Sequence, residues 1–325
     1  MNDKKENILE IKNLSVSLEK EKNKIPVLNN ISLEVKEGQV LGIVGESGCG
    51  KSMLASVLMG LIPSHGKINT GTIYFDGTYI EGFSQKQFQQ IRGSRISMIF
   101  QEPMTSLNPL MPCGIQIEEC ILAHTKIKRS EAKRITLEMI EQVGIKDPEV
   151  IYRQVPGKLS GGMRQRIMIA AALVCKPKLL ICDEPTTAID VTIQAQILQL
   201  IKKLQRENGT TVLFISHDMA VISEMSDNIA VFYAGSLVEY GKKKDIFLNP
   251  LHPYTSALQK AIPNIDKHVD YLETIPGIVP SPEKLPAGCI FADRCKYAEE
   301  KCFMCKPELV NVGTQKVKCF KPFNK

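Results

Sequence analysis

The segment Gly45–Ser52 constrains the fold of this chain more than any other part of its sequence. Its letters, GESGCGKS, match the pattern G-x-x-x-x-G-K-[ST] at every position. It follows the apolar run Val40–Val44 and precedes a predicted helix over residues 53–60. In such a strand–loop–helix unit, glycines let backbone N–H groups surround a phosphate, and the helix N-terminus adds positive potential. The alternative, a glycine turn followed by chance by Lys-Ser, leaves the flanking strand and helix unexplained.

The residues of this predicted phosphate loop have different tasks. We expect Lys51 to reach the β- and γ-phosphates of a nucleotide and the Ser52 hydroxyl to bind Mg²⁺. The predicted nucleotide-binding residues of the loop are Gly45, Glu46, Ser47, Gly48, Cys49, Gly50, Lys51 and Ser52.

Apolar runs alternate with helical patterns along the first 250 residues. The runs Ile96–Phe100, Leu179–Cys182 and Val212–Ile215 predict buried strands, and the alternation over residues 31–35 predicts a half-buried one. One helix is predicted over residues 192–207, and another begins at Ser130 as its N-cap and ends at Gly144. Buried strands that alternate with helices indicate an α/β core.

A pair of carboxylates follows one of these strands. Asp183 and Glu184 end the apolar run Leu179–Cys182, at the edge where an open α/β sheet places its ligand. We expect Asp183 to hold Mg²⁺ and Glu184 to act as the general base that polarises an attacking water. The alternative is a solvated acidic turn with no catalytic role.

The overall composition excludes several classes of protein. The net charge of +6 is too weak to indicate a nucleic-acid partner, so we expect none. The start of the chain lacks the apolar region of a secretory signal, and no run approaches the roughly 18 apolar residues of a membrane helix. We expect a soluble, intracellular chain whose ten cysteines form no structural disulfides.

The octapeptide Leu159–Arg166, LSGGMRQR, resembles the signature of the ABC ATPases, LSGGQ, with Met163 in place of Gln. Ser160 and the backbone N–H groups of Gly161 and Gly162 would cap the next helix and form an anion site. In that family the signature of one subunit completes the ATP site of the other. The resemblance therefore implies a dimer that holds two ATP molecules between its subunits. An ordinary Ser-Gly-Gly helix cap is the alternative.

Other positions match the ABC family in the same order along the chain. The resemblance implies that Gln101 contacts Mg²⁺ and the attacking water, that Asp190 is the D-loop aspartate, and that His217 contacts the γ-phosphate. The aromatic residue that usually stacks on adenine is missing from residues 15–27, so we expect Ile25 or Val27 to pack on the base. The catalytic residues that the resemblance implies are Glu184, His217 and Gln101, and the Mg²⁺ ligands are Ser52, Gln101 and Asp183.

Two further segments narrow the resemblance to the ATP-binding subunits of oligopeptide/dipeptide permeases. They are QEPMTSLNP at residues 101–109 and HPYT at residues 252–255. The implied fold is a P-loop NTPase of ABC type, with a mixed-sheet core, a helical signature subdomain and an antiparallel β subdomain. We place the nucleotide-binding domain at residues 1–250, its helical subdomain at about 102–175, and a loop-rich C-terminal extension with metal-binding cysteines at 251–325.

Five cysteines gather near the end of the chain. Four of them have the spacing C-x5-C-x6-C-x16-C, and the resemblance implies that they bind a [4Fe–4S] cluster. Zinc or no metal at all are alternatives, and Cys305 makes the ligand set ambiguous. The favoured ligands are Cys289, Cys295, Cys302 and Cys319.

The resemblance implies the energy-coupling ATPase of an oligopeptide or dipeptide importer at the cytoplasmic face of the cell membrane. The expected partners are two membrane permease subunits, a second and similar ATPase that makes a heterodimer, and an extracytoplasmic solute-binding protein. The same role in a nickel or metal-chelate importer is an alternative. A soluble non-transport ABC ATPase lacks support because the chain has a single cassette and no long heptad region. An iron–sulfur redox protein would leave the cassette unexplained.

Overall fold

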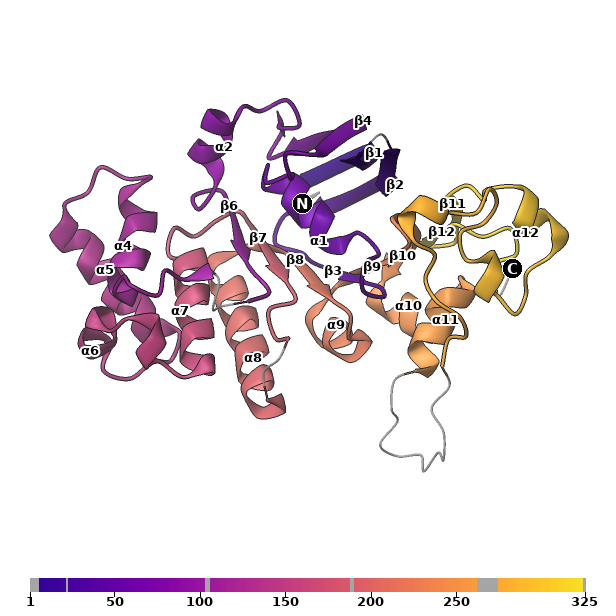
Figure 1. Cartoon of the computed structure of the whole chain (residues 1–325). Helices are drawn as coiled ribbons and strands as arrows, with labels where there is room; N and C mark the ends of the chain where they lie inside the picture. Colours follow the sequence, from indigo (N-terminus) through magenta and orange to yellow (C-terminus); the bar gives the residue numbers. More distant parts are fainter. Residues whose placement is uncertain (1–5, 22, 103–105, 188–189, 262–273, 324–325) are drawn as a thin grey trace, which may run out of the picture. The chain divides into compact units, whose positions relative to one another are not determined.

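The computed structural model describes residues 6–21, 23–102, 106–187, 190–261 and 274–323 (Figure 1). It divides into two compact units. The first contains residues 1–8, 36–39 and 82–213, and the second contains residues 9–35, 40–81 and 214–325. The chain passes from the first unit to the second within strand β8, Thr211–Ser216.

The first unit combines three strands with a group of helices. β6 (Ile96–Ile99) pairs in parallel with β7 (Leu179–Asp183), and β8 is the next strand in the sheet. The helices are α2 (Gln85–Ile91), α4 (Cys113–Leu122), α5 (Arg129–Gln142), α6 (Pro148–Arg153), α7 (Gly161–Leu173) and α8 (Val191–Asn208), with a 3-10 turn at Pro156–Lys158. Figure 1 shows α4, α5 and α6 gathered beside α7.

An antiparallel sheet forms one layer of the second unit. Its order is β2-β1-β4-β5, and Leu9 lies opposite Phe75 in the β1–β4 pair. The strands are β1 (Asn7–Lys20), β2 (Asn23–Lys36), β4 (Gly66–Phe75) and β5 (Thr78–Tyr79). This sheet matches the antiparallel β subdomain expected from the sequence.

A second, mixed sheet in the same unit carries the phosphate loop. β3 (Val40–Val44) pairs in parallel with β9 (Asn228–Tyr233), and β10 (Ser236–Lys242) continues antiparallel to β9. The hairpin β11–β12 (Val310–Val312 and Gln315–Val317) then adds to β10. The other elements are α1 (Lys51–Leu58), α9 (Met219–Met225), α10 (Lys243–Leu248), α11 (Pro253–Lys260), α12 (Glu300–Met304) and 3-10 turns at Pro282–Lys284 and Ala292–Arg294.

The strands predicted from apolar runs are confirmed, and two helix starts need correction. The helix of the phosphate loop begins at Lys51, two residues before the prediction. Helix α5 begins at Arg129 with Lys128 as its N-cap, so the prediction that Ser130 caps it is wrong. The predicted end is right, because Gly144 has a left-handed φ of 77°.

The C-terminal tail has more regular structure than the sequence predicted. Its hairpin β11–β12 joins the mixed sheet, where Val317 is fully buried opposite Glu239 of β10. This extension was missed because two strands of three residues leave little periodicity to detect. Within the described residues, none of the helices combines the length and the apolar character needed to cross a lipid bilayer.

Candidate functional site

The glycines of the phosphate loop are required by close contacts and by backbone conformation. A Cβ on Gly45 would lie 2.1 Å from the carbonyl oxygen of Phe232, so only glycine fits where β3 leaves the sheet. Gly50 has φ of 96° and is the N-cap of α1. Because glycine adopts this conformation without a Cβ penalty, the chain can turn sharply into the helix.

Lys51 lies inside the curve of this loop. Its side chain is buried, and its Nζ donates to the carbonyl oxygens of Gly45 at 2.7 Å and Glu46 at 3.1 Å. Burial raises the pKa of the Cys49 thiol beside it, an effect that the charge of Lys51 opposes. Cys49 is therefore a packing residue of the loop, and Lys51 is its buried cation.

The predicted general base of the first unit is held by two neighbours. The Nε2 of Gln101 donates to Oε2 of Glu184 at 3.3 Å, and Oγ1 of Thr187 donates to the same oxygen at 2.9 Å. Glu184 has φ of 47°, a conformation that costs a non-glycine residue about 1–3 kcal/mol and that concentrates at functional sites. Asp183, one residue earlier at the end of β7, is buried.

The signature segment caps a long helix, as predicted. Oγ of Ser160 accepts a hydrogen bond from the backbone N–H of Met163 at 3.3 Å, at the start of α7. Ser160 and Gly161 are exposed and Gly162 is half-buried, so this helix N-terminus is open to solvent. Farther along the same helix, the buried Gln165 donates through Nε2 to the carbonyl oxygen of Pro185 at 2.5 Å. This bond links α7 to the turn that carries Glu184.

Two further predicted site residues lie at or just before the starts of helices. Asp190 is the exposed N-cap of α8, and its neighbours 188 and 189 lie outside the described residues. His217 is exposed at the end of β8. The next residue, Asp218, caps α9 by accepting from the N–H groups of Ala220 and Val221, which fixes the backbone just after His217.

The predicted cluster ligands gather around one cavity of about 30 Å³ in the tail. Burial raises the pKa of three of the thiols, that of Cys319 to about 11, with those of Cys289 and Cys295 raised as well. Cys305 is exposed and does not line this cavity. The four cysteines on the cavity are Cys289, Cys295, Cys302 and Cys319.

The geometry around that cavity does not support the predicted [4Fe–4S] cluster. In the part of the chain that the structure describes, no three His, Cys, Asp or Glu side chains converge closely enough to hold a metal ion. A cavity of about 30 Å³ has room for one water molecule, far less than four irons and four sulfides need. The side chains would have to rearrange before a cluster could form.

Comparisons with known proteins identify the family to which the chain belongs. The family described as "ABC transporter" matches residues 28–187, and "Oligopeptide/dipeptide transporter, C-terminal region" matches residues 238–302. The oligopeptide transport ATP-binding protein AppD of Bacillus subtilis is 45% identical over 315 residues, which cover 96% of each protein. The chain belongs to the oligopeptide/dipeptide type of ABC transporter ATP-binding proteins. As a member of this family, it is an ATPase.

Two further comparisons extend the family assignment. The dipeptide transport ATP-binding protein DppD of Haemophilus influenzae is 44% identical, covering 98% of this chain and 96% of that protein. Among solved structures, the dimeric bacterial ABC transporter cassette MJ0796 has a TM-score of 0.65 and 28% identity, covering 72% of this chain and 98% of that one. The cassette has the ABC fold, and the relatives also match its tail.

The two units each contain part of the predicted site. The second holds the phosphate loop and His217, and the first holds the acidic pair, Gln101, the signature and Asp190. The sequence analysis did not predict several side chains that hydrogen-bond to the phosphate loop or to the turn that carries Glu184. Thr187 could have been found because it lies three residues after Glu184, but the other three bond to residues far from them in sequence. Those three are Gln165, Tyr254 and Arg294.

Proposed function

We propose that this ABC ATPase couples ATP hydrolysis to the import of oligopeptides or dipeptides. The observation that carries the proposal is similarity along nearly the whole chain, including the C-terminal region matched at residues 238–302, to proteins named for oligopeptide and dipeptide transport. The ABC cassette MJ0796 covers 72% of this chain, whereas the relatives AppD and DppD match over 96% and 98% of it. The tail therefore separates a peptide-importer subunit from other ABC ATPases.

The proposed site residues have different tasks. Lys51 and the loop Gly45–Ser52 bind the phosphates of ATP, and Glu184 accepts a proton from the attacking water. The hydroxyl of Ser52, the carboxylate of Asp183 and the amide oxygen of Gln101 are donors of the type that Mg²⁺ prefers, so we assign the metal to them. Mg²⁺ would neutralise charge on the phosphates. Gln101 orients the water through its contact with Glu184, and His217 contacts the γ-phosphate.

The signature would serve a neighbouring subunit. The N-terminus of α7 is exposed at Ser160 and Gly161, which suits an anion site completed by another chain. The similar cassette MJ0796 is described as dimeric. We propose that this chain pairs with a second, similar ATPase, with Asp190 at the contact. Two membrane permease subunits and an extracytoplasmic solute-binding protein would complete the importer, which places the chain at the cytoplasmic face of the membrane.

Two finer assignments belong to the same proposal. The nucleotide-binding domain would span residues 1–250, with its helical subdomain at about 102–175, and the extension would span 251–325. A half-buried side chain on β2, that of Ile25 or Val27, would pack on the adenine. Apolar packing of that kind is compatible with the lack of an aromatic residue in this region.

The substitution Glu184→Gln tests the catalytic assignment. It should lower the ATPase rate of the assembled importer by about 10²–10⁴-fold and leave ATP binding intact, because an amide cannot accept the proton. The measurement is phosphate release together with binding of a fluorescent ATP analogue. Glu207→Gln at the exposed end of α8 makes the same change in charge and should hydrolyse ATP normally. Turnover near wild type in Glu184→Gln would contradict the role of this residue.

Cargo is tested in a strain that lacks this chain. Uptake of labelled di- and oligopeptides should be lost, restored by the wild-type chain, and not restored by Glu184→Gln. Uptake of ⁶³Ni²⁺ is measured in the same cells. Loss of nickel uptake with normal peptide uptake would overturn the peptide assignment in favour of a metal importer.

The cysteine cavity supports a narrower proposal. We propose that the four thiols that line it bind a metal centre after rearrangement, with an iron–sulfur cluster as the first candidate and zinc as the second. The donor set supports this, because four cysteine thiols suit either centre, and His252 and Glu299 also line the cavity. The proposed role is structural, since a metal can hold together a segment with little apolar core.

Metal analysis of protein purified without oxygen tests the cavity. Wild type should contain iron and sulfide with a brown absorbance, or else one zinc. Cys319→Ser should lose most of that metal. Cys305→Ser is the matched control, because Cys305 is exposed and outside the cavity, and it should keep the metal. Metal-free, colourless wild type would refute the proposal.

A further inference from the structure

An ion pair connects the C-terminal tail to the phosphate loop within the second unit. Nη1 of Arg294 donates to Oε1 of Glu46 at 2.8 Å, and Nη2 donates to Oε2 at 3.1 Å. The pair is therefore bidentate, the strong geometry for guanidinium and carboxylate. The Arg294 side chain is only 5% exposed and that of Glu46 is 29% exposed, so water screens the pair weakly.

The guanidinium group of Arg294 is held on its other sides as well. Its Nε donates to the carbonyl oxygen of Pro276 at 2.8 Å, and Nη1 also donates to the hydroxyl of Tyr233 at 3.3 Å. Its central carbon lies 5.7 Å from the centroid of the Tyr233 ring. Because these hydrogen bonds form at the same time, they hold the guanidinium group in one orientation, in which it pairs with the carboxylate of Glu46.

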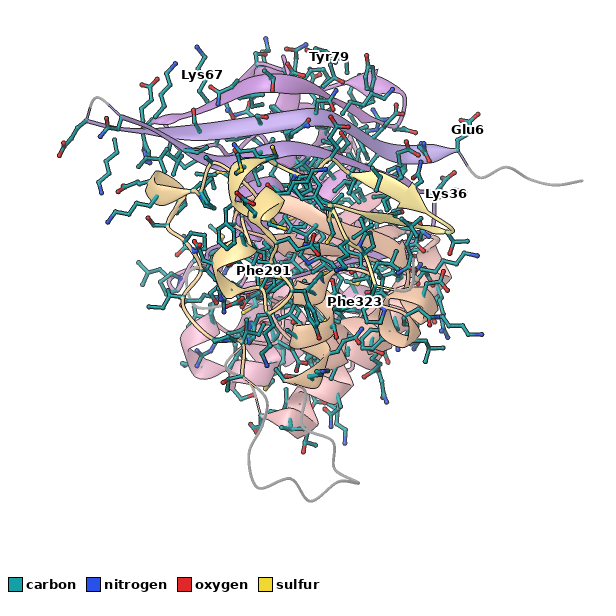
Figure 2. The ribbon with its side chains drawn as sticks, turned by 90° about the vertical axis from the view of Figure 1, so that its right-hand side faces the viewer. Glu6, Lys36, Lys67, Tyr79, Phe291 and Phe323 are labelled. Atoms are coloured by element: carbon teal, nitrogen blue, oxygen red, sulfur yellow. The ribbon has the colours of Figure 1, made fainter. Side chains whose placement is uncertain are left out.

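The cysteine-bearing segment fixes the position of the Arg294 backbone. Arg294 ends a 3-10 turn in which Ala292 N–H donates to Cys289 O at 3.0 Å and Cys295 N–H donates to Ala292 O at 3.1 Å. Cys289 N–H in turn donates to Cys302 O at 2.7 Å. Phe291, labelled in Figure 2, packs against Tyr233 with ring centroids 5.2 Å apart. A change in the cysteine turn would therefore move Arg294.

A second residue from beyond the cassette holds the same point of the loop. The backbone N–H of Glu46 donates to the hydroxyl of Tyr254 at 3.0 Å. Tyr254 is fully buried on α11, where its ring lies 4.7 Å from that of Tyr233. Both the backbone and the carboxylate of Glu46 are thus anchored by residues of the C-terminal region.

We propose that Arg294 and Tyr254 are positioning residues through which the cysteine-bearing tail holds the phosphate loop in its nucleotide-binding shape. The inference rests on the proposed role of Gly45–Ser52 as the ATP site. Two physical effects support it. Fixing Glu46 lowers the ordering cost when phosphates bind, because the loop is already in place. Arg294 also neutralises a carboxylate that would otherwise repel the phosphates of ATP at short range.

The test measures binding of a fluorescent ATP analogue with Mg²⁺ to the purified full-length chain. Arg294→Gln should raise Kd about tenfold, and Tyr254→Phe should raise it a few-fold. Arg294→Lys keeps the positive charge but cannot make the two parallel hydrogen bonds of a guanidinium group. Its Kd should therefore lie between those of the wild type and Arg294→Gln. In the assembled importer the same changes should raise the KM for ATP much more than they lower kcat, because neither residue touches the reacting atoms.

A double substitution separates positioning from simple loss of stability. Glu46→Gln in the Arg294→Gln background removes the unpaired carboxylate, so it should recover part of the lost affinity. Lys296→Gln makes the same charge change two residues away on an exposed side chain and should bind as wild type does. Melting temperatures are recorded for every variant. If Arg294→Gln does not fold, Arg294→Lys and Tyr254→Phe decide the question.

The possible outcomes are distinct. Wild-type affinity in a folded Arg294→Gln or in both milder variants would overturn the inference. If Arg294→Gln lowers the affinity for the ATP analogue tenfold and adding Glu46→Gln recovers none of it, the electrostatic argument fails. That result would overturn the proposed role of the ion pair between Arg294 and Glu46. Failure of the wild type to bind the analogue, with no difference from Lys51→Ala, would instead contradict the proposed nucleotide site itself.

Discussion

At the scale of single residues, burial shifts the pKa values of two side chains around the start of the tail. The carboxylate of Glu239 is fully buried and accepts from the backbone N–H groups of Leu251 at 2.7 Å and His252 at 2.9 Å. Burial raises the pKa of Glu239, and these bonds oppose that rise. Burial also lowers the pKa of His252 to about 3, so its ring is neutral and Nδ1 accepts from Tyr254 N–H at 3.0 Å.

The lowered pKa of His252 predicts a loss of stability in acid. Between about pH 6.5 and pH 3 the unfolded chain binds a proton at this residue that the folded chain does not. The free energy of unfolding should therefore fall as pH falls, by up to about 1.4 kcal/mol per pH unit, or about 2 kcal/mol from pH 7 to pH 5. Above pH 6.5 the effect disappears, because the ring is neutral in both states.

His252→Asn tests this prediction by urea unfolding at pH 7 and pH 5. Asparagine is a good N-cap and does not titrate, so the variant should lose about 2 kcal/mol less than wild type over this interval. The exposed His65 gives the control, since His65→Gln should show the wild-type pH dependence. Parallel losses in wild type and His252→Asn would refute the assignment.

At the scale of elements, helix starts were harder to predict than helices. The stripe of apolar residues predicted α8 to within one residue at each end, because a buried face repeats through the whole helix. A cap depends on one side chain and one N–H group. Ser160 makes that bond at α7, whereas Ser130 lies inside the first turn of α5, whose N-cap Lys128 makes no side-chain cap bond.

Paired substitutions at these two serines test the difference. Ser160→Ala should lower the free energy of unfolding by about 1 kcal/mol, because an N–H group of α7 loses its partner, and Ser160→Asn should preserve it. Ser130→Ala should change stability by less than about 0.5 kcal/mol, as is usual for an exposed position. Urea unfolding followed by circular dichroism measures all three. Equal effects at both serines would contradict the observed capping.

At the scale of the whole molecule, the tail is part of the second unit and not an appendage to it. Its hairpin β11–β12 extends the mixed sheet, and Phe291, which is labelled in Figure 2, packs with Tyr233 and Tyr254. Arg294 then joins it to the phosphate loop. The cassette and the tail are recognisable as separate stretches of sequence, yet they share one core in this unit.

The main elements and the helix cap at Ser160 could be predicted because their causes are local. The apolar runs predicted β3, β6, β7 and β8, and the glycine pattern placed the phosphate loop. The contacts that hold those residues could not be predicted in the same way. Gln165 and Pro185 are 20 residues apart, and Arg294 and Glu46 are 248 residues apart. No periodicity or short motif encodes a pairing over such a separation.

The sequence by itself determined the family, the position of the glycine loop Gly45–Ser52 and the order of strands and helices, because each depends on residue types at short, fixed spacings. Only the tertiary structure decided which side chains hold that loop and how the tail cysteines lie. Both depend on the path of the chain through the sheet. That path brought Arg294 and Tyr254 to Glu46, and it gathered four thiols around a cavity without bringing them within ligand distance of a single ion.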